Sequence, residues 1–357
     1  MSSFPYFELS GSPQEIGQQA GNKFGDRIRS NFSFYEKFFA DLLKISPDNF
    51  ARSKILKKEL RRISLDFGLI VKNLFPRLDT EICAMAKAAN MEEWQIYLLN
   101  ARTEIYRILK QNIPVAEVGE CTSLYFPKSK VLGQNWDWHP SLEELCVVTK
   151  ITSDSGRSFV MLTEPGIIGK IGLNSDGLGV CLNILFSDCG ISGVPVHIML
   201  RGILESSNLS EAKLLIERLP RGTTSNLLIA DSSGQALDIE LKGQEMKAAS
   251  LTGGELIHTN HYFGDELSAS ASLPGSIERL KRAEQLYRDL SEHGIEGMEK
   301  ILCDKENETY PICRNYAMGL DFMVGTVASV IMNLEARQML LVKGPPNENS
   351  DWASYTL

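Results

Sequence analysis

The chain of 357 residues has no apolar run that approaches the eighteen or so residues needed to span a bilayer. Its first residues, Met1 to Tyr6, also lack the basic region and apolar core of a secretory signal. We therefore expect a protein that contacts no membrane and is kept in the cytoplasm. An excess of positive charge is absent as well. The net charge is −8, whereas nucleic-acid binding requires clustered Lys and Arg, so a nucleic acid is not an expected partner.

Two local clusters of basic residues depart from this acidic balance. Each cluster falls within a predicted helix, and we interpret each as a solvated helix face. The first cluster consists of Lys54, Lys57, Lys58, Arg61 and Arg62, and the second of Arg279, Lys281 and Arg282.

The cysteines lack the spacing of a metal site or a disulfide framework. There are seven of them, an odd number, and no two form a CxxC pair. We therefore expect no metal ion and no set of disulfides. Most of the cysteines are expected to be small buried hydrophobes.

Hydrophobic periodicity predicts helices from residue 13 to about residue 110. Five aromatic or aliphatic residues recur at spacings of three or four and form one stripe of a long helix. They are Phe24, Ile28, Phe32, Tyr35 and Phe39. Ser12 is suited to cap this helix and Pro13 to begin it. Further helices are expected at 54–75, 78–89 and 91–110.

After residue 121 the pattern changes to short runs rich in β-forming residues, separated by turn sequences. Strands are expected at 147–152, 159–163, 178–183, 226–230 and 236–241, and a final hairpin pairs 326–333 with 338–343. Helices are expected at 195–206, at 210–219 with Ser210 as its cap, and at about 275–291. This order predicts an α+β fold in which helices cover antiparallel sheets.

Cys121 has the most informative context of any residue. It follows Gly119-Glu120 and opens the strand-like run Thr-Ser-Leu-Tyr-Phe. A thiol at this position can attack the carbonyl before it, and hydrolysis then frees an α-amine beside the thiol. Because a free α-amine ordinarily has a pKa of about 8, it can accept the thiol proton without help from a histidine.

Four stretches of sequence occur in a characteristic order. They are Cys-Thr-Ser-Leu-Tyr at 121–125 with Gly-Gln-Asn-Trp-Asp at 133–137, Thr-Glu-Pro-Gly-Ile-Ile-Gly-Lys-Ile-Gly at 163–172, Ser-Gly-Val-Pro-Val-His-Ile at 192–198, and Ile-His-Thr-Asn-His at 257–261. Together they resemble the isopenicillin-N N-acyltransferase (penicillin acyltransferase) family of N-terminal-nucleophile enzymes. The likeness runs from near Gly11 to the final hairpin.

This resemblance implies a four-layer αββα sandwich of the N-terminal-nucleophile hydrolase type, with a helical N-terminal segment. It also implies self-cleavage at the junction of Glu120 and Cys121. The products would be a small chain, 1–120, and a large chain, 121–357, which remain together as a heterodimer and form one interlocked folding unit.

The resemblance assigns roles to particular side chains. Cys121 matches the nucleophile, and Asn260 matches an asparagine that donates a hydrogen bond to the oxyanion of the tetrahedral intermediate. Asp137 matches a pocket aspartate that would orient the freed α-amine or a substrate amine. Thr122 and Arg314 are candidate substrate-binding residues.

The sequence departs from the family pattern at two places. Glu120 stands where the best-known members have glycine, and its Cβ and negative charge disfavour both a strained backbone and a neighbouring thiolate. Residues 320–325 lack an arginine that, in members acting on penicillins, can pair with a substrate carboxylate. A penicillin nucleus is therefore disfavoured as the natural substrate.

The expected activity is that of an N-terminal cysteine acyltransferase or amide hydrolase on small amides or acyl-coenzyme A thioesters, because one acyl-enzyme serves both reactions. No bound cofactor is expected, and a coenzyme A thioester would enter only as a co-substrate, with a small amine as acceptor. One alternative is a papain-like amidase that pairs Cys121 with His258 or His261 and does not cleave itself. Another is a non-catalytic binding protein that retains the fold.

Overall fold

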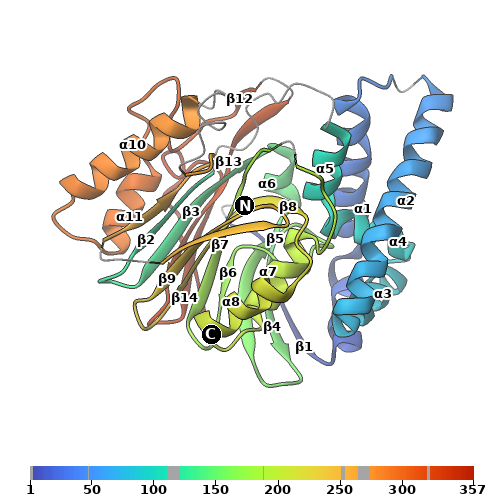
Figure 1. The fold of residues 1–357 in the computed structure, drawn as a ribbon, viewed down its shortest axis with the longest axis horizontal. Helices are drawn as coiled ribbons and strands as arrows, with labels where there is room; N and C mark the ends of the chain where they lie inside the picture. The colour runs from blue at the N-terminus through green and yellow to red at the C-terminus, as the bar shows by residue number, and fades with distance from the viewer. Residues whose placement is uncertain are drawn as a thin grey trace.

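Two β-sheets pack face to face, and helices cover both outer faces (Figure 1). The computed structural model describes residues 3–46, 48–110, 121–187, 189–250, 254–263, 274–319 and 322–357. The resulting order of layers, helix, sheet, sheet and helix, confirms the predicted α+β sandwich of αββα type.

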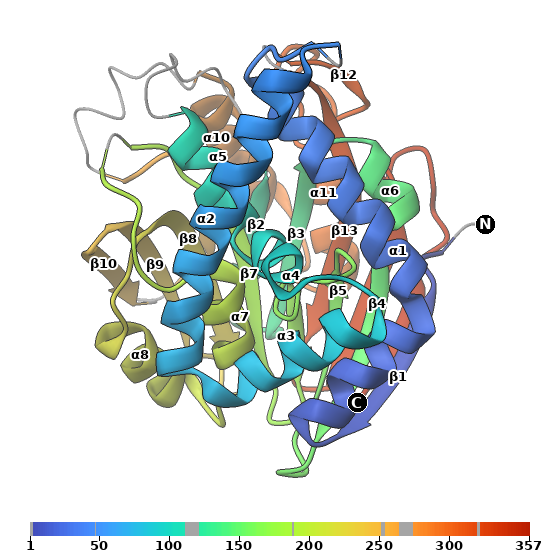
Figure 2. The same cartoon turned by 90° about the vertical axis from the view of Figure 1, so that its right-hand side faces the viewer.

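The N-terminal segment forms most of one helical layer (Figure 2). Its helices are α1 (Pro13–Leu42), α2 (Phe50–Leu74), α3 (Pro76–Ala88), α4 (Glu93–Asn100) and α5 (Arg102–Lys110). Ser12 caps α1 in a capping box with Glu15, and Pro13 lies in the first turn, as predicted. All five residues of the predicted stripe are buried. The single helix expected at 91–110 is wrong, because the backbone leaves helical geometry at Ala101 and divides it into α4 and α5.

The first sheet lies against this helical layer. Its order is β1 (Tyr6–Gly11), β4 (Val147–Ser153), β5 (Ser158–Thr163), β6 (Gly172–Asn174), β7 (Leu178–Ile184), β8 (Thr223–Asp231), β9 (Ala236–Gly243) and β10 (Glu245–Ser250). Strand β1 pairs in parallel with β4. The N-terminal segment is therefore not purely helical, since it also supplies an edge strand to the sheet.

Two further helices, α7 (Val196–Leu204) and α8 (Leu209–Arg218), complete the layer over the first sheet. The predicted cap of α8 is wrong. Asn208, in extended geometry, accepts the hydrogen bond from the Glu211 backbone N–H, whereas Ser210 already lies inside the first helical turn.

The second sheet contains β2, the strand that begins directly after Cys121. Its order is β11 (Leu256–His258), β2 (Thr122–Phe126), β3 (Val131–Trp138), β13 (Met323–Asn333), β14 (Gln338–Lys343) and β15 (Ala353–Thr356), and the short β12 (Ala317–Met318) pairs with β13. The β13–β14 register, which runs from Ala328↔Lys343 to Asn333↔Gln338, confirms the predicted hairpin. Helices α10 (Pro274–Asp289) and α11 (Ile295–Leu302) cover the outer face, and α6 (Ser141–Leu145) follows β3.

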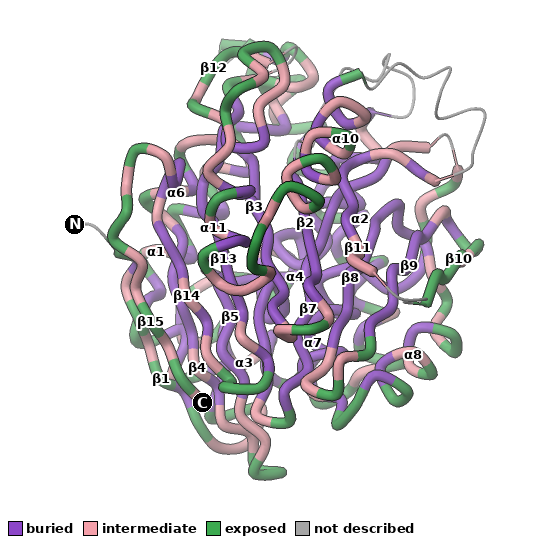
Figure 3. The backbone as a smooth tube through the Cα atoms, turned by 90° about the vertical axis from the view of Figure 1, so that its left-hand side faces the viewer, coloured by how far each residue is buried: buried purple, intermediate pink, exposed green. Residues whose placement is uncertain are grey.

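Buried residues concentrate along the inner strands of both sheets, as the purple tube shows (Figure 3). Gln134 of β3 joins the sheets directly, since its side chain donates to the Leu182 carbonyl at 2.5 Å and accepts from the Leu182 N–H at 3.0 Å. The sheets are therefore held in register by polar contacts as well as by apolar packing.

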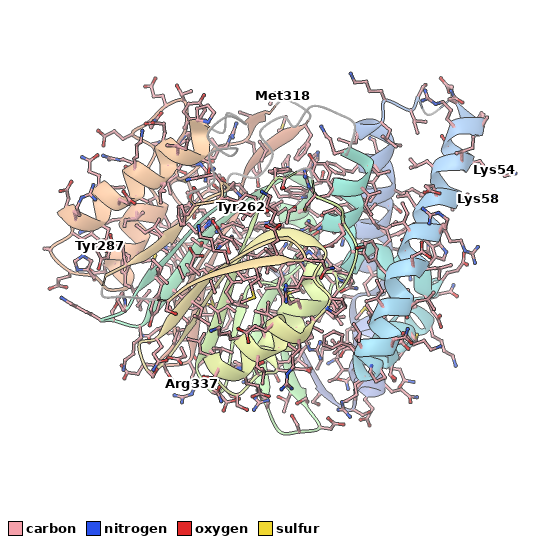
Figure 4. The ribbon with its side chains drawn as sticks, viewed as in Figure 1. Lys54, Lys58, Tyr262, Tyr287, Met318 and Arg337 are labelled. Atoms are coloured by element: carbon pink, nitrogen blue, oxygen red, sulfur yellow. The ribbon has the colours of Figure 1, made fainter. Side chains whose placement is uncertain are left out.

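The first basic cluster is a solvated face, as predicted: its side chains are exposed, and Lys54 and Lys58 point away from α2 (Figure 4). All seven cysteines are free thiols. Among the helices of the described residues, none combines the length and apolar character needed to cross a membrane. The same residues contain no cluster of three or more His, Cys, Asp or Glu side chains placed to hold a metal ion.

Candidate active site

Cys121 lies directly before β2, in the buried interior between the layers. Its side chain is only 3% exposed, and the sulfur lies 3.9 Å from the backbone carbonyl oxygen of Asp137. Burial and then the Asp137 carboxylate raise the pKa of the thiol from 9.0 to about 11, against opposing effects that include Arg279 and Lys170. The thiol of the uncut chain is therefore protonated at neutral pH. Glu120, the other half of the predicted junction, lies outside the described residues.

Arg279 of α10 joins the backbone at Cys121 and Thr122 to the candidate oxyanion residue, Asn260. Its Nη1 donates to the Cys121 carbonyl at 2.7 Å and to the Thr122 hydroxyl at 3.0 Å, and its Nη2 donates to Asn260 Oδ1 at 3.0 Å. The interpretation of Arg279 as part of a solvated face is wrong, because the residue is only 2% exposed. The amphipathic pattern of α10 misled us: this arginine lies on the buried side and Lys281 on the exposed side.

Asn260 is fully buried and held by three partners. Its Nδ2 donates to the Ile184 carbonyl at 2.9 Å, its Oδ1 accepts from Arg279, and its backbone N–H donates to the Ser276 hydroxyl at 2.7 Å. These bonds fix which end of the carboxamide is oxygen. Since the amide nitrogen carries two hydrogens and Ile184 takes one, the second can donate to an oxyanion.

Asp137 lies near the end of β3 and is completely buried. Neither carboxylate oxygen has a hydrogen-bond partner among the described residues. Burial raises the pKa of this carboxyl from 3.8 to about 7, and the facing Thr326 hydroxyl and Arg279 lower it only in part. Arg314 is bonded to Thr326, the residue of β13 that pairs with Asp137. Its backbone N–H donates to Thr326 Oγ1 at 3.0 Å, and its carbonyl accepts from the Thr326 N–H at 2.8 Å.

The two faces of the second sheet separate these groups. Side chains alternate between the two faces along a strand. Ser123 and its cross-strand partner Gln134 face the first sheet. Asn135 faces the helices instead, since its side chain donates to the carbonyls of Leu302 and Ile312. By the same alternation Cys121 points between the sheets, and Asp137 points toward the α11 side. The site therefore lies at the start of β2 and the end of β3, with polar groups on both faces.

A buried ionic cluster lies on the Cys121 side of the sheet. Glu164 accepts from Arg102 Nη2 at 2.6 Å, from Lys170 Nζ at 2.5 Å and from the Tyr35 hydroxyl at 2.5 Å. The Lys170 ammonium also lies 3.0 Å from the ring centroid of Trp136, the residue before Asp137. Burial lowers the pKa of Lys170 to about 8 even though Glu164 opposes that change. One carboxylate thus faces two cations, which leaves net positive charge near the thiol.

Neither candidate histidine has a hydrogen bond to the thiol among the described residues. The ring nitrogens of His258 face Glu240 Oε1 at 3.1 Å and the Thr259 carbonyl at 2.8 Å. His261 Nδ1 lies 2.8 Å from the Ser276 hydroxyl. The papain-like alternative therefore lacks its defining Cys–His contact.

The five site residues singled out from the sequence fall into two groups in space. Arg279 links Cys121 and Thr122 to Asn260, although Asn260 is far along the chain. Thr326 of β13 pairs with Asp137 in register and also bonds the backbone of Arg314.

Sequence reasoning missed Arg279 and Lys170 as members of the site. Lys170 belonged to one of the motif stretches, but nothing in its spacing indicated an ammonium that acts on the Cys121 thiol. For Arg279 no usable sequence signal exists, because its role depends on how α10 docks on β2.

The αββα sandwich is the fold of the N-terminal-nucleophile hydrolase type, and the buried thiol of Cys121 lies at the start of one of its inner strands. The chain belongs to the acyl-coenzyme A:6-aminopenicillanic acid acyl-transferase family, whose model matches residues 126–348. That range begins after Cys121, so the match does not itself include this candidate nucleophile. Family and fold together make the protein an enzyme of acyl transfer or acyl hydrolysis.

Individual proteins show the same likeness. Over 344 residues the chain is 29% identical to the acyl-coenzyme A:6-aminopenicillanic-acid-acyltransferase 40 kDa form of Emericella nidulans, covering 94% of this chain and 92% of that protein. Among solved structures, a mutant of conjugated bile acid hydrolase from Clostridium perfringens matches with a TM-score of 0.46 and 15% identity, over 66% of this chain and 92% of that one. Penicillin V acylase from Agrobacterium tumefaciens matches with a TM-score of 0.46 and 13% identity, over 62% and 82%.

Proposed function

We propose that this protein is a self-cleaving N-terminal cysteine acyltransferase or amide hydrolase that acts on small amides or acyl-coenzyme A thioesters through a Cys121 acyl-enzyme. One observation supports this above the others. A single buried guanidinium, that of Arg279, holds both the Cys121 carbonyl and the Asn260 carboxamide. A candidate nucleophile and a candidate oxyanion donor are thereby brought to one place by a residue that contacts both.

Self-cleavage would convert the uncut chain into the active enzyme. The Cys121 sulfur attacks the Glu120 carbonyl carbon, the Glu120–Cys121 C–N bond breaks, and the Glu120 acyl group passes to sulfur while the nitrogen takes the thiol proton. Water then hydrolyses this thioester and releases the Glu120 carboxylate and the free thiol. The new α-amine is the base that the uncut chain lacks, since the thiol pKa of about 11 keeps it protonated before cleavage.

The mature enzyme would use the same groups on a substrate. The α-amine takes the thiol proton, and the thiolate attacks the acyl carbonyl carbon. Asn260 Nδ2–H donates to the oxyanion, which is a contribution of about 2.7 to 4 kcal/mol for one such donor. The leaving amine or thiol departs with a proton from the α-ammonium, and the thioester then passes its acyl group to water or to an acceptor amine.

The buried Asp137 carboxylate supports this scheme. A buried charge without a donor is costly, and both oxygens of Asp137 lack a partner among the described residues. An α-ammonium on Cys121 would supply the missing opposite charge, since Asp137 is close enough to raise the thiol pKa. Asp137 would then orient the amine, and Thr122 and Arg314 remain predicted substrate contacts.

The proposal extends to partners and location. The chains 1–120 and 121–357 would stay together as a heterodimer, because β1 of the first pairs with β4 of the second along six residues. A coenzyme A thioester would serve only as a co-substrate, and no metal or bound cofactor takes part. We propose the cytoplasm as the place of action.

Intact mass of freshly purified protein tests the proposal. The expected result is two chains with a break between Glu120 and Cys121, and a single uncut chain for Cys121→Ala. Cys181→Ala is the control, because Cys181 is another buried free cysteine, on β7, and it should cleave like the wild type. Uncut wild-type protein that turns over acyl amides would overturn the proposal.

The two alternatives give different results in the same experiments. A papain-like amidase would be active uncut and would lose activity on His258→Ala or His261→Ala. A non-catalytic binding protein would show no turnover, and its Cys121 would react with an alkylating probe no faster than the denatured thiol.

A further inference from the structure

His258, the last residue of β11, lies in a buried setting that requires a second proton on its ring. Its Nε2 faces a carboxylate oxygen of Glu240 at 3.1 Å, and its Nδ1 faces the Thr259 carbonyl oxygen at 2.8 Å. Both partners accept hydrogen bonds, so both ring nitrogens donate, which only the imidazolium can do. Burial alone lowers the His258 pKa, but Asp238 and Glu240 outweigh it and the pKa is raised.

Glu240 holds the far end of the same segment as well. Its Oε1, which accepts from His258, also accepts the Phe263 backbone N–H at 2.7 Å. The Tyr262 hydroxyl adds a bond from the same segment to the Leu241 carbonyl at 2.8 Å. One carboxylate of β9, in the first sheet, therefore clamps both ends of residues 258–263, which leave the second sheet at β11.

Asn260 is at the middle of this clamped segment. We propose that Glu240 and His258 form a positioning pair that holds the 258–263 segment between the two sheets and so sets where the Asn260 carboxamide points. Neither side chain has a hydrogen bond or an ion pair with Cys121 among the described residues. This inference rests on the proposed function, since it concerns the residue that stabilises the oxyanion there.

The reason such a clamp matters is geometric. The Asn260 carboxamide bonds to Ile184 in the first sheet and to Arg279 in α10, so its place depends on the spacing of separate layers. An oxyanion donor works only within hydrogen-bond distance of the developing charge, and a displacement of about 1 Å costs on the order of a hundredfold in rate. A segment held at both ends to one carboxylate keeps that spacing.

The test uses purified, cleaved protein with p-nitrophenyl acetate as the acyl donor. Glu240→Ala removes the acceptor of both donors and should lower kcat about ten- to a hundredfold, with KM within about twofold of the wild type. Glu205→Gln is the control. It alters a carboxylate that pairs with Arg201, away from this segment, and should leave both constants unchanged.

Glu240→Gln gives a second, more conservative variant. The amide oxygen still accepts from His258 and Phe263, but the negative charge is gone. The titratable groups that remain around the ring are Asp238 on β9 and His261 on the same segment. The second proton of His258 is then held less tightly, so the pKa of His258 falls. Glu240→Gln should keep near wild-type kcat at low pH, and its kcat should decline at a lower pH than that of the wild type as the pH is raised. An unchanged pH profile with wild-type kcat would overturn the inference.

A double-mutant cycle decides whether Glu240 acts through Asn260. Asn260→Ala alone should lower kcat by about a hundred- to a thousandfold, and adding Glu240→Ala should change it by less than about twofold. Losses that multiply would overturn the inference. If Asn260→Ala retains full kcat, the oxyanion role in the proposed function fails along with it, whereas a fully active Glu240→Ala beside an impaired Asn260→Ala overturns the positioning pair alone.

Discussion

The ionised Asp137 carboxylate should destabilise the uncut chain and stabilise the cleaved protein. In the uncut chain the carboxyl is buried without a donor, and its pKa is about 7 instead of 3.8. The folded state therefore binds the proton more tightly than the unfolded state. The associated stability is fully present below pH 4 and is lost as the pH rises through 7.

The size of this loss follows from the two pKa values. Each unit of difference is about 1.36 kcal/mol, so ionising Asp137 costs about 4 kcal/mol of the free energy of unfolding above pH 7, and about 3 kcal/mol of that falls between pH 5 and pH 8. Asn at this position cannot ionise. In a Cys121→Ala background, which keeps the chain intact, Asp137→Asn should therefore shrink the stability difference between pH 5 and pH 8 by about 3 kcal/mol.

Urea denaturation at both pH values measures this effect. Cys121→Ala is compared with Cys121→Ala/Asp137→Asn, and Asp289→Asn in the same background is the control because Asp289 is an exposed carboxylate at the end of α10. The control should leave the pH difference as it is. An equal pH difference with and without Asp137 would refute the reasoning. In cleaved protein the sign should reverse, because Asp137→Asn would remove the proposed counterion of the α-ammonium and lower both stability and turnover.

Three further changes test other parts of the site. Arg279→Lys keeps the charge but not the planar fork that reaches two separate acceptors, so self-cleavage followed by intact mass should slow about tenfold or more, and an unchanged time course would contradict the bridge. Glu164→Gln leaves the buried cations Arg102 and Lys170 without a counterion and should cost about 3 to 5 kcal/mol in urea denaturation, whereas Glu205→Gln at a partly exposed pair should cost less than about 1 kcal/mol. Gly17→Ala places a Cβ against the Glu81 backbone carbonyl where α1 meets α3 and should cost about 1 to 3 kcal/mol, and a thermal melt equal to that of the wild type would contradict this close approach.

Local pattern was a reliable guide where one element supplies its own signal. The stripe from Phe24 to Phe39 predicted α1, because side chains three and four apart share one helix face whatever they pack against. The final hairpin was equally clear, since two β-rich runs flank a short turn. The thiol before β2 and the carboxamide of Asn260 were found through motif order, and the structure links them through Arg279.

Elements that depend on distant partners were missed. Strand β1 has only six residues, and it becomes a strand because β4, far along the chain, offers it a free edge. The helix expected at 91–110 breaks at Ala101, where its own sequence shows neither glycine nor proline. In both cases packing against the rest of the molecule overrode local preference.

The sequence by itself determined the class of fold and indicated candidate residues for acyl transfer, because periodicity and motif order are properties of neighbouring residues. It could not determine the surroundings of those residues. Only the tertiary structure placed Arg279 between Cys121 and Asn260, left the Asp137 carboxylate buried without a donor, and set Glu240 against His258. Each of these depends on distances between separate layers, and such distances arise only when the two sheets and their helices pack together.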